Sequence, residues 1–186
     1  MEYLKRSSST RVEDDPQIAS RVQEMLRTIR HEGEPAIKRY ARELDGWEDE
    51  FVLSDAKKKM LIDLVPEQTK SDLQFSLKQI NRFAEAQRAS LTEFEIQTEP
   101  GVVLGQRLVP IQTVGCYVPG GRYAHAASAL MSIATARVAG VSEIIACSPP
   151  RGSSIHPAVA YAMDLAGVNV ILEMGGVQAI ASMAFG

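Results

Sequence analysis

Apolar side chains recur every three or four residues through the first half of the chain, which is typical of helices packed by one face. Asp14 and Asp15 before Pro16 predict the start of the first helix. Gly46 predicts the end of a second helix, and Ser54 predicts the start of a third. The apolar face of the first helix comprises Ile18, Val22, Met25, Leu26 and Ile29.

A fourth helix is expected over residues 66–89, and the pattern then changes. Apolar and polar residues alternate over 93–99, as in a half-exposed strand. Pro100 and Gly101 fit the middle of a type II turn, after which an apolar stretch returns. The sequence therefore predicts a β-hairpin over 93–110 that connects the two halves of the chain.

Strand and helix patterns alternate through the second half, which predicts a parallel sheet with helical crossovers. Gly140 and Gly167 each stand where a helix must end and turn into a strand, a place that favours glycine. Because three strands are few for this pattern and the series still runs at Gly186, we expect further sequence or a partner chain to complete the fold. The strands are expected at 111–118, 143–148 and 169–174, and the helices at 126–139, 156–166 and 177–185.

The composition is that of a globular protein, with 45% apolar and 23% charged residues among 186. A net charge of −3 provides no basic surface for nucleic acid. Cys116 and Cys147 are expected as reduced, buried thiols, because no CxxC or HxxxH spacing suggests zinc. The sequence has no apolar run of membrane-spanning length and no signal-peptide pattern at its start. We therefore expect a cytoplasmic protein that binds neither nucleic acid nor membrane.

The three predicted strands end in turns rich in proline and glycine, at 118–121, 148–150 and 174–176. In a parallel sheet these ends share one edge, where ligands of α/β proteins bind. Amides at the following helix N-termini can receive an anion such as a pyrophosphate, and glycines let a ligand approach the backbone. The alternative is that these residues only make turns. Neither GxGxxG nor GxxxxGK[ST] occurs in the sequence.

Five polar side chains near these turns are candidates for ligand contacts. Tyr117 could stack on a nucleotide base or be a partly buried strand tyrosine. Gln178 could hydrogen-bond a ribose or an amide, or it could be a solvated helix start. Arg122 is placed to meet a phosphate or a sulfonate, whereas His125 and His156 are expected to be surface or capping histidines. The sequence suggests no Ser-His-Asp set, no Cys-His set and no metal-ligand spacing.

Several segments resemble the histidinol dehydrogenase family: "PGVVLGQRLVPIQTVGCYVPGG" (100–121), "ARVAGVSEIIACSPP" (136–150) and "GGVQAIASMAFG" (175–186). Upstream, "IRHEGEPAIKRYARELDGW" and "NRFAEAQ" resemble the N-terminal part of the family. The resemblance covers nearly the whole chain. Members of the family are more than twice as long, so the chain resembles an N-terminal portion.

The resemblance implies an α/β fold in which a helical N-terminal segment precedes an incomplete Rossmann-like parallel sheet with flanking helices. Residues 1–92 would be mainly helical and part of a first domain. Residues 93–110 would be the hairpin connection. Residues 111–186 would form a Rossmann-like αβ domain truncated at its C-terminal side.

The resemblance also implies a homodimeric, zinc-requiring alcohol dehydrogenase that uses NAD to oxidise L-histidinol to L-histidine, in histidine biosynthesis. The NAD contacts of the family fall on Tyr117 and Gln178, with Gly120 and Gly121 in the adjoining Pro-Gly-Gly turn. Its zinc ligands and its Glu-His acid/base pair are expected beyond residue 186. No residue of this chain is therefore expected to be catalytic or to bind metal, and the chain alone is expected to be inactive.

The stretch after the Pro-Gly-Gly turn, "RYAHAASALM" (122–131), departs from the small residues and proline usual in histidinol oxidisers. Arg122 and Tyr123 add bulk and charge there, which resembles paralogues that act on other alcohols such as sulfopropanediol. Two further hypotheses therefore stay open. One is a paralogue with an anionic diol substrate, and the other is a non-catalytic binding or assembly module.

Overall fold

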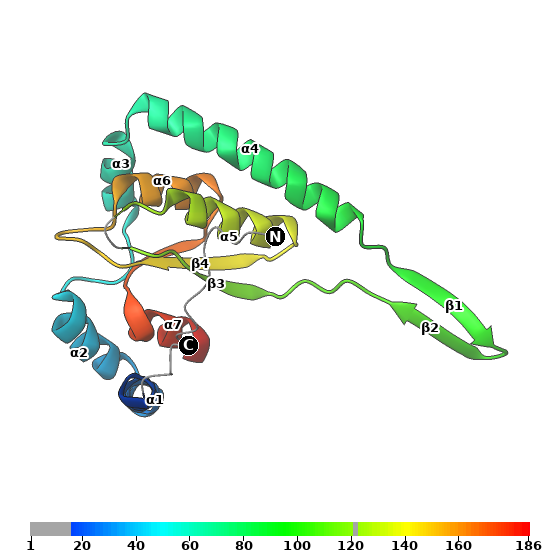
Figure 1. Ribbon diagram of the computed structural model, residues 1–186, viewed down its shortest axis with the longest axis horizontal. Helices are drawn as coiled ribbons and strands as arrows, with labels where there is room; N and C mark the ends of the chain where they lie inside the picture. The colour runs from blue at the N-terminus through cyan, green and yellow to red at the C-terminus, as the bar shows by residue number, and fades with distance from the viewer. Residues whose placement is uncertain (1–15, 121–122) are drawn as a thin grey trace, which may run out of the picture.

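The computed structural model describes residues 16–120 and 123–186, which form a small sheet between layers of helices, with a hairpin projecting to one side (Figure 1). The helices are α1 (Pro16–Glu32), α2 (Glu34–Asp45), α3 (Asp55–Asp63), α4 (Glu67–Ala89), α5 (Ala126–Val138), α6 (Pro157–Leu165) and α7 (Gly176–Phe185). The strands are β1 (Phe94–Glu99), β2 (Val102–Gln106), β3 (Thr113–Tyr117), β4 (Glu143–Ser148) and β5 (Val170–Glu173). The expected cap at Asp14 and Asp15, and also Gly121 and Arg122, lie outside the described residues.

Strands β3, β4 and β5 form a parallel sheet in that order, as the alternating pattern predicts. In its register Thr113 is opposite Glu143, and Ile145 is opposite Val170. Helices α5 and α6 lie on one face of the sheet and α7 lies on the other (Figure 1). With helices on both faces, the strands need apolar side chains in both directions, which explains their near-continuous apolar sequence.

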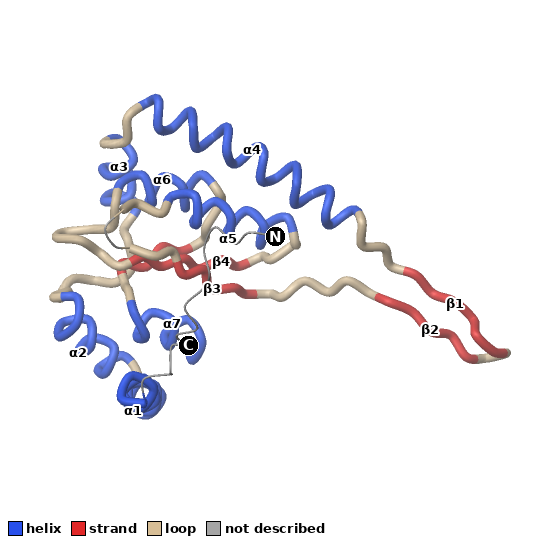
Figure 2. The backbone as a smooth tube through the Cα atoms, viewed as in Figure 1, coloured by secondary structure: helices blue, strands red, loops and turns tan. Residues whose placement is uncertain are grey.

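The N-terminal helices pack on both sides of this sheet. Helices α3 and α4 lie on α5 and α6, whereas α1 and α2 lie against α7 (Figure 2). Leu53 and Leu61 belong to the same buried cluster as Ile144 at the centre of the sheet. Val52 forms an antiparallel bridge to Leu172, so the segment before α3 adds to the β5 edge. The buried cluster around the sheet therefore includes residues from both before and after residue 92.

Local sequence signals set the ends of several helices as predicted. The Ser54 side chain accepts a hydrogen bond of 3.3 Å from the Lys57 backbone N–H and caps α3. Gly46 ends α2 in the left-handed conformation, with φ of 63°. Gly140 and Gly167 have φ of 93° and 85°, which allows each helix to turn directly into the next strand.

The hairpin differs from its prediction in one respect. Strands β1 and β2 pair in antiparallel fashion, and Gly101 makes the turn with φ of 84°. The sequence predicts a half-exposed strand, yet every residue of β1 and β2 is exposed. The reason is that the hairpin extends away from the sheet and helices, so nothing in the described chain covers either of its faces (Figure 2).

A buried carboxylate connects three parts of the fold. Glu173, at the end of β5, has only 1% of its surface exposed. Its Oε2 accepts a hydrogen bond of 2.7 Å from Lys57 Nζ of α3. Its Oε1 accepts from the Ser154 hydroxyl and from the Ile155 backbone N–H, in the loop before α6. A buried charge is tolerated when it is paired and hydrogen-bonded in this way, so Glu173 fixes that loop to the sheet.

Replacing Glu173 with Gln should lower the free energy of unfolding by about 2 kcal/mol, because the network loses its charge and Lys57 loses its partner. Lys57 keeps some contact with water, which limits the loss. Urea unfolding followed by circular dichroism measures the effect. The matched control is Glu34→Gln, which removes an exposed pair with Lys38 and should change stability far less. Equal losses of unfolding free energy for the two substitutions would show that the buried Glu173 network stabilises the fold no more than an exposed ion pair does.

Candidate functional site

The three strand tips meet at one edge of the sheet, and Pro149 is the residue between them. A Cβ added to Gly120, after β3, would lie 2.3 Å from Pro149 Cγ. A Cβ added to Gly175, after β5, would lie 2.5 Å from Pro149 Cβ. These two glycines therefore make room for Pro149 itself. The sequence analysis interprets the glycines of these turns as leaving room for a ligand. At Gly120 and Gly175 the space beside the glycine is filled by Pro149 instead.

Side chains of this edge are divided between the two faces of the sheet. Cys116 and Ala146 belong to the core beneath α5 and α6. Tyr117 and Cys147, the next residue of each strand, belong to the cluster beside α7. Because direction alternates along a strand, Ser148 points back to the α5 and α6 side. The edge therefore offers two separate surfaces to a ligand.

Tyr117 lies on the α7 side with its ring partly buried. Its hydroxyl accepts a hydrogen bond of 3.4 Å from the backbone N–H of Gly176, the first residue of α7. Gly176 has φ of 65°, a conformation that favours glycine. The tyrosine thus stands where β3 meets the start of α7.

Gln178 lies in the interior, whereas the sequence interpretations place it either at a ligand or in solvent. Its side chain is fully buried, and its Nε2 donates a hydrogen bond of 2.8 Å to Asp45 Oδ2. Its Oε1 is buried without a hydrogen-bond partner. A Cβ on Gly176 would lie 2.9 Å from that oxygen, so any side chain at this position would cover it.

Asp45 is the residue of this site that the sequence analysis misses. It ends α2 and lies over the start of α7, where the Gly175 backbone also donates to it. Burial raises the pKa of the Asp45 carboxyl above its usual value, and the hydrogen bonds from Gln178 and Gly175 oppose this rise. The only sequence signal here is the helix end at "LDGW", which says nothing of a partner 133 positions away.

The helix N-termini at this edge are not equally available to an anion. Asp45 covers the start of α7. At α6, the Ala158 backbone N–H donates 3.2 Å to His156 Nδ1, which confirms His156 as a capping histidine. At α5, His125 makes no side-chain cap. Protein side chains therefore already occupy two of the three positions that the sequence assigns to an anion.

The cysteines have no chemical role in this geometry. Cys116 and Cys147 are buried and unpaired thiols, as predicted. Burial raises the pKa of Cys147 to about 12, so the thiol stays protonated and unreactive at neutral pH. Residues 16–120 and 123–186 contain no group of three His, Cys, Asp or Glu residues able to hold a metal ion. Within the same residues, every helix is too short or too polar to cross a membrane.

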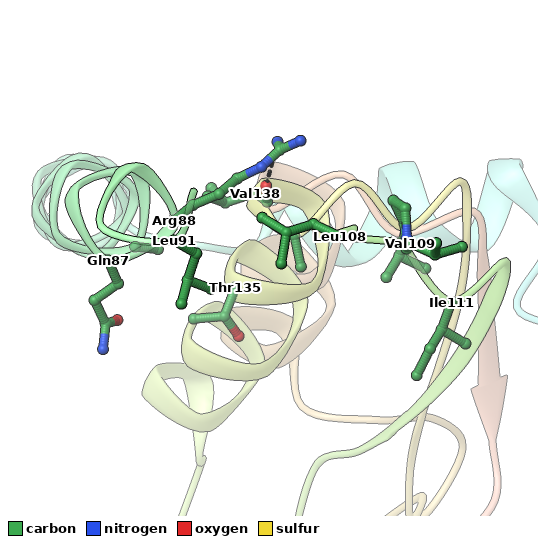
Figure 3. A pocket seen from close by; sticks show the side chains of 12 residues that line it. Gln87, Arg88, Leu91, Leu108, Val109, Ile111, Thr135 and Val138 are labelled. Carbon is green, nitrogen blue, oxygen red and sulfur yellow. Dashed lines mark hydrogen bonds between the residues drawn. The ribbon is translucent and has the colours of Figure 1, made fainter. Parts of the chain in front are cut away.

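An apolar pocket lies at the opposite end of the sheet from the strand tips. It has a volume of about 460 Å³ and lies where the hairpin leaves the fold, between α4 and α5 (Figure 3). Leu91, Leu108 and Val138 surround it, and Arg88 Nη1 at its margin donates 2.7 Å to the Val138 carbonyl. It holds no set of groups suited to catalysis, so the strand tips remain the candidate site.

Comparison with known proteins agrees with this geometry. The protein is 52% identical to a histidinol dehydrogenase homolog of Ruegeria pomeroyi, over 89% of this chain and 38% of the relative. It is 43% identical to the sulfopropanediol 3-dehydrogenase of the same organism, over 100% of this chain and 43% of the relative. The crystal structure of histidinol dehydrogenase from Elizabethkingia anophelis superposes with a TM-score of 0.84 at 26% identity, over 100% of this chain and 41% of that one.

The chain thus spans about two fifths of the length of these relatives. The sequence model of the histidinol dehydrogenase family matches residues 8–186. The parallel order of β3, β4 and β5 and the covering helices recur in a solved member of that family. The chain therefore belongs to the histidinol dehydrogenase family.

Proposed function

We propose that this chain supplies part of the dinucleotide site of an NAD-dependent alcohol dehydrogenase of the cytoplasm. The observation that carries the proposal is the unpaired Oε1 of Gln178, buried behind Gly176 and beside Tyr117. An unpaired buried acceptor costs about 1–3 kcal/mol. An unpaired acceptor of this kind does not stabilise the fold. A ligand that donates a hydrogen bond to Oε1 would give it a partner.

The residues on the α7 side fit a dinucleotide. Tyr117 offers a partly exposed aromatic ring for stacking, and Gln178 offers an acceptor for a ribose hydroxyl or a carboxamide N–H. Asp45 accepts a hydrogen bond from Gln178 Nε2. This bond fixes the orientation of the amide, so that Oε1 faces Gly176. Asp45 is therefore a positioning residue in this proposal. Gly120 would lie at the margin of the site.

When bound, the nicotinamide would accept a hydride from the alcohol carbon of the substrate. The residues of this chain would hold and orient the cofactor and exclude water from one side of it. The zinc that the resemblance implies does not fit the described residues, which offer no metal-binding group. We therefore assign no step of the reaction to zinc within this chain.

Two substrates are consistent with the family. L-Histidinol follows from the family itself. Sulfopropanediol is favoured by the 43% identity to a sulfopropanediol 3-dehydrogenase along the entire chain. The non-catalytic module remains a further candidate for the 186 residues alone, since the described residues contain no group able to hold a metal ion.

Tyr117→Ala should weaken NAD binding by roughly tenfold, because stacking of a base on an aromatic ring is lost. Tyr117→Phe keeps the ring and should bind NAD almost as the unchanged protein does. Gln178→Met removes the acceptor at similar volume and should also weaken binding. Isothermal titration calorimetry with NAD measures these affinities. Exposed Gln68→Met is the matched control. NAD binding that is indifferent to both Tyr117→Ala and Gln178→Met would refute this site.

We expect the 186-residue chain to show no turnover on its own, because its described residues contain no group able to hold the zinc that the resemblance implies. NADH absorbance is followed with L-histidinol and with sulfopropanediol, each in the presence of NAD and zinc. A longer protein that contains the same segment serves as the positive control. Zinc-dependent NADH formation by the purified chain would contradict this expectation.

We also propose that two copies associate through the hairpin, in line with the homodimer that the resemblance implies. Ile96 and Leu104 are cross-strand partners, and each is more than half exposed at 52% and 54%. Apolar side chains this exposed on a projecting hairpin are typical of an interaction surface. An apolar pocket lined by Leu91 and Leu108 lies at the base of the same hairpin.

A double substitution, Ile96→Asp with Leu104→Asp, should convert a dimer to a monomer, because it places charge on the apolar face. Size-exclusion chromatography with light scattering gives the mass in solution. Gln97→Asp with Thr98→Asp is the control, since it adds the same charge to the same hairpin at polar positions. A monomeric unchanged protein would contradict the proposal, and so would a dimer that survives the apolar substitutions.

A further inference from the structure

A second cavity lies at the strand tips, on the side of the sheet away from Tyr117 and Gln178. It has a volume of about 360 Å³ and lies between the end of β3, the end of β4 and the start of α6. Small-molecule sites begin at about 300 Å³, so this cavity suits one chemical group and is too small for a whole dinucleotide. The residues that matter here are Gly120, Ser148, Arg151, His156 and Val159.

Ser148 provides a buried polar group that points into this cavity. It is 2% exposed and is one of the residues that line the cavity. As the last residue of β4 it points to the same side as Ala146, toward α5 and α6. A hydroxyl in the wall of a cavity can donate a hydrogen bond to a ligand bound there.

His156 provides a second hydrogen-bond donor, the N–H of its imidazole ring. Its Nδ1 accepts the Ala158 backbone N–H at 3.2 Å. A neutral imidazole has one acceptor and one donor nitrogen, so the proton of His156 is on Nε2. That N–H makes no hydrogen bond to any described residue, and the ring lines the cavity.

Arg151 provides the charge. Its side chain lines the cavity and forms no ion pair within the described residues. Its backbone is held by a hydrogen bond of 2.9 Å from its N–H to the Ser154 carbonyl. Ser154 in turn donates to the buried Glu173, so the loop that carries Arg151 is anchored to the sheet. No acidic residue is among the described residues that line the cavity.

We propose that this cavity binds a tetrahedral oxyanion, through Arg151, Ser148 and His156. All three side chains donate hydrogen bonds, and a guanidinium is suited to phosphate and sulfonate geometry. Two sources share this chemistry: a phosphate of the dinucleotide that reaches over the Pro149 edge, and the sulfonate of an anionic diol substrate. The choice between these sources rests on the proposed function, whereas the oxyanion site itself rests only on the cavity and its donors.

The first test measures inorganic phosphate and inorganic sulfate binding to the 186-residue chain by NMR titration at constant ionic strength. Arg151→Gln should weaken binding by roughly tenfold or more, since one charge-assisted hydrogen bond is lost. Ser148→Ala should weaken it by a smaller factor with little effect on the fold. Arg107→Gln is the matched control, because it removes the same charge from the hairpin end and should leave binding unchanged. Equal affinities for Arg151→Gln and Arg107→Gln, or no binding to the unchanged protein, would overturn the proposal.

The second test compares NAD and sulfopropanediol as ligands of the same variants. Weaker NAD binding by Arg151→Gln assigns the site to a cofactor phosphate, and weaker sulfopropanediol binding assigns it to the substrate sulfonate. Either result supports the oxyanion site. If the unchanged chain binds phosphate through Arg151 but does not bind NAD, the oxyanion site stands and the proposed function fails. If NAD binds through Tyr117 and no oxyanion binds through Arg151, the proposed function stands and the oxyanion site fails.

Discussion

The contact of Pro149 with two glycines holds the strand tips together. Gly120 and Gly175 come from the outer strands of the sheet, and each lies so close to this proline that a methyl group would not fit. The register of the sheet alone brings the strand ends into one row. The proline contact closes that row, so that the loops after β3, β4 and β5 pack directly against one another. Every side chain proposed to meet a ligand lies at the end of one of these strands, in the loop after it, or in the helix that follows.

This closed row separates two chemically different surfaces. The α7 side carries an aromatic ring and a buried amide oxygen, which suit a flat, uncharged group. The α5 and α6 side carries a guanidinium, a hydroxyl and an imidazole N–H, which suit a compact anion. The two surfaces share Pro149 and little else. A ligand that carries both a flat ring and an anionic group could bridge them, and a dinucleotide has a base at each end with its pyrophosphate between them.

The features that could be predicted from the sequence are those set by residues close together in the chain. The cap at Ser54 and the left-handed glycines at Gly140 and Gly167 depend on neighbours within a few residues, and all three were found as expected. The resemblance was confirmed by the family match, and the parallel sheet by the structure. The pairing of Gln178 with Asp45 and of Glu173 with Lys57 spans more than a hundred positions, and periodicity carries no information about it. The glycines illustrate the same limit, since a turn motif does not say which atom will fill the space beside it.

The antiparallel bridge between Val52 and Leu172 has one more effect, on how the sheet can grow. Because this segment occupies part of the β5 edge, that side is blocked to a new strand. On the other side, β3 has no neighbour within the described residues. An unpaired backbone edge is a template for strand addition, so extension of the sheet is directional and begins next to Tyr117. A parallel strand added there would bring its own carboxyl end, with whatever side chains it carries, directly alongside the tyrosine ring.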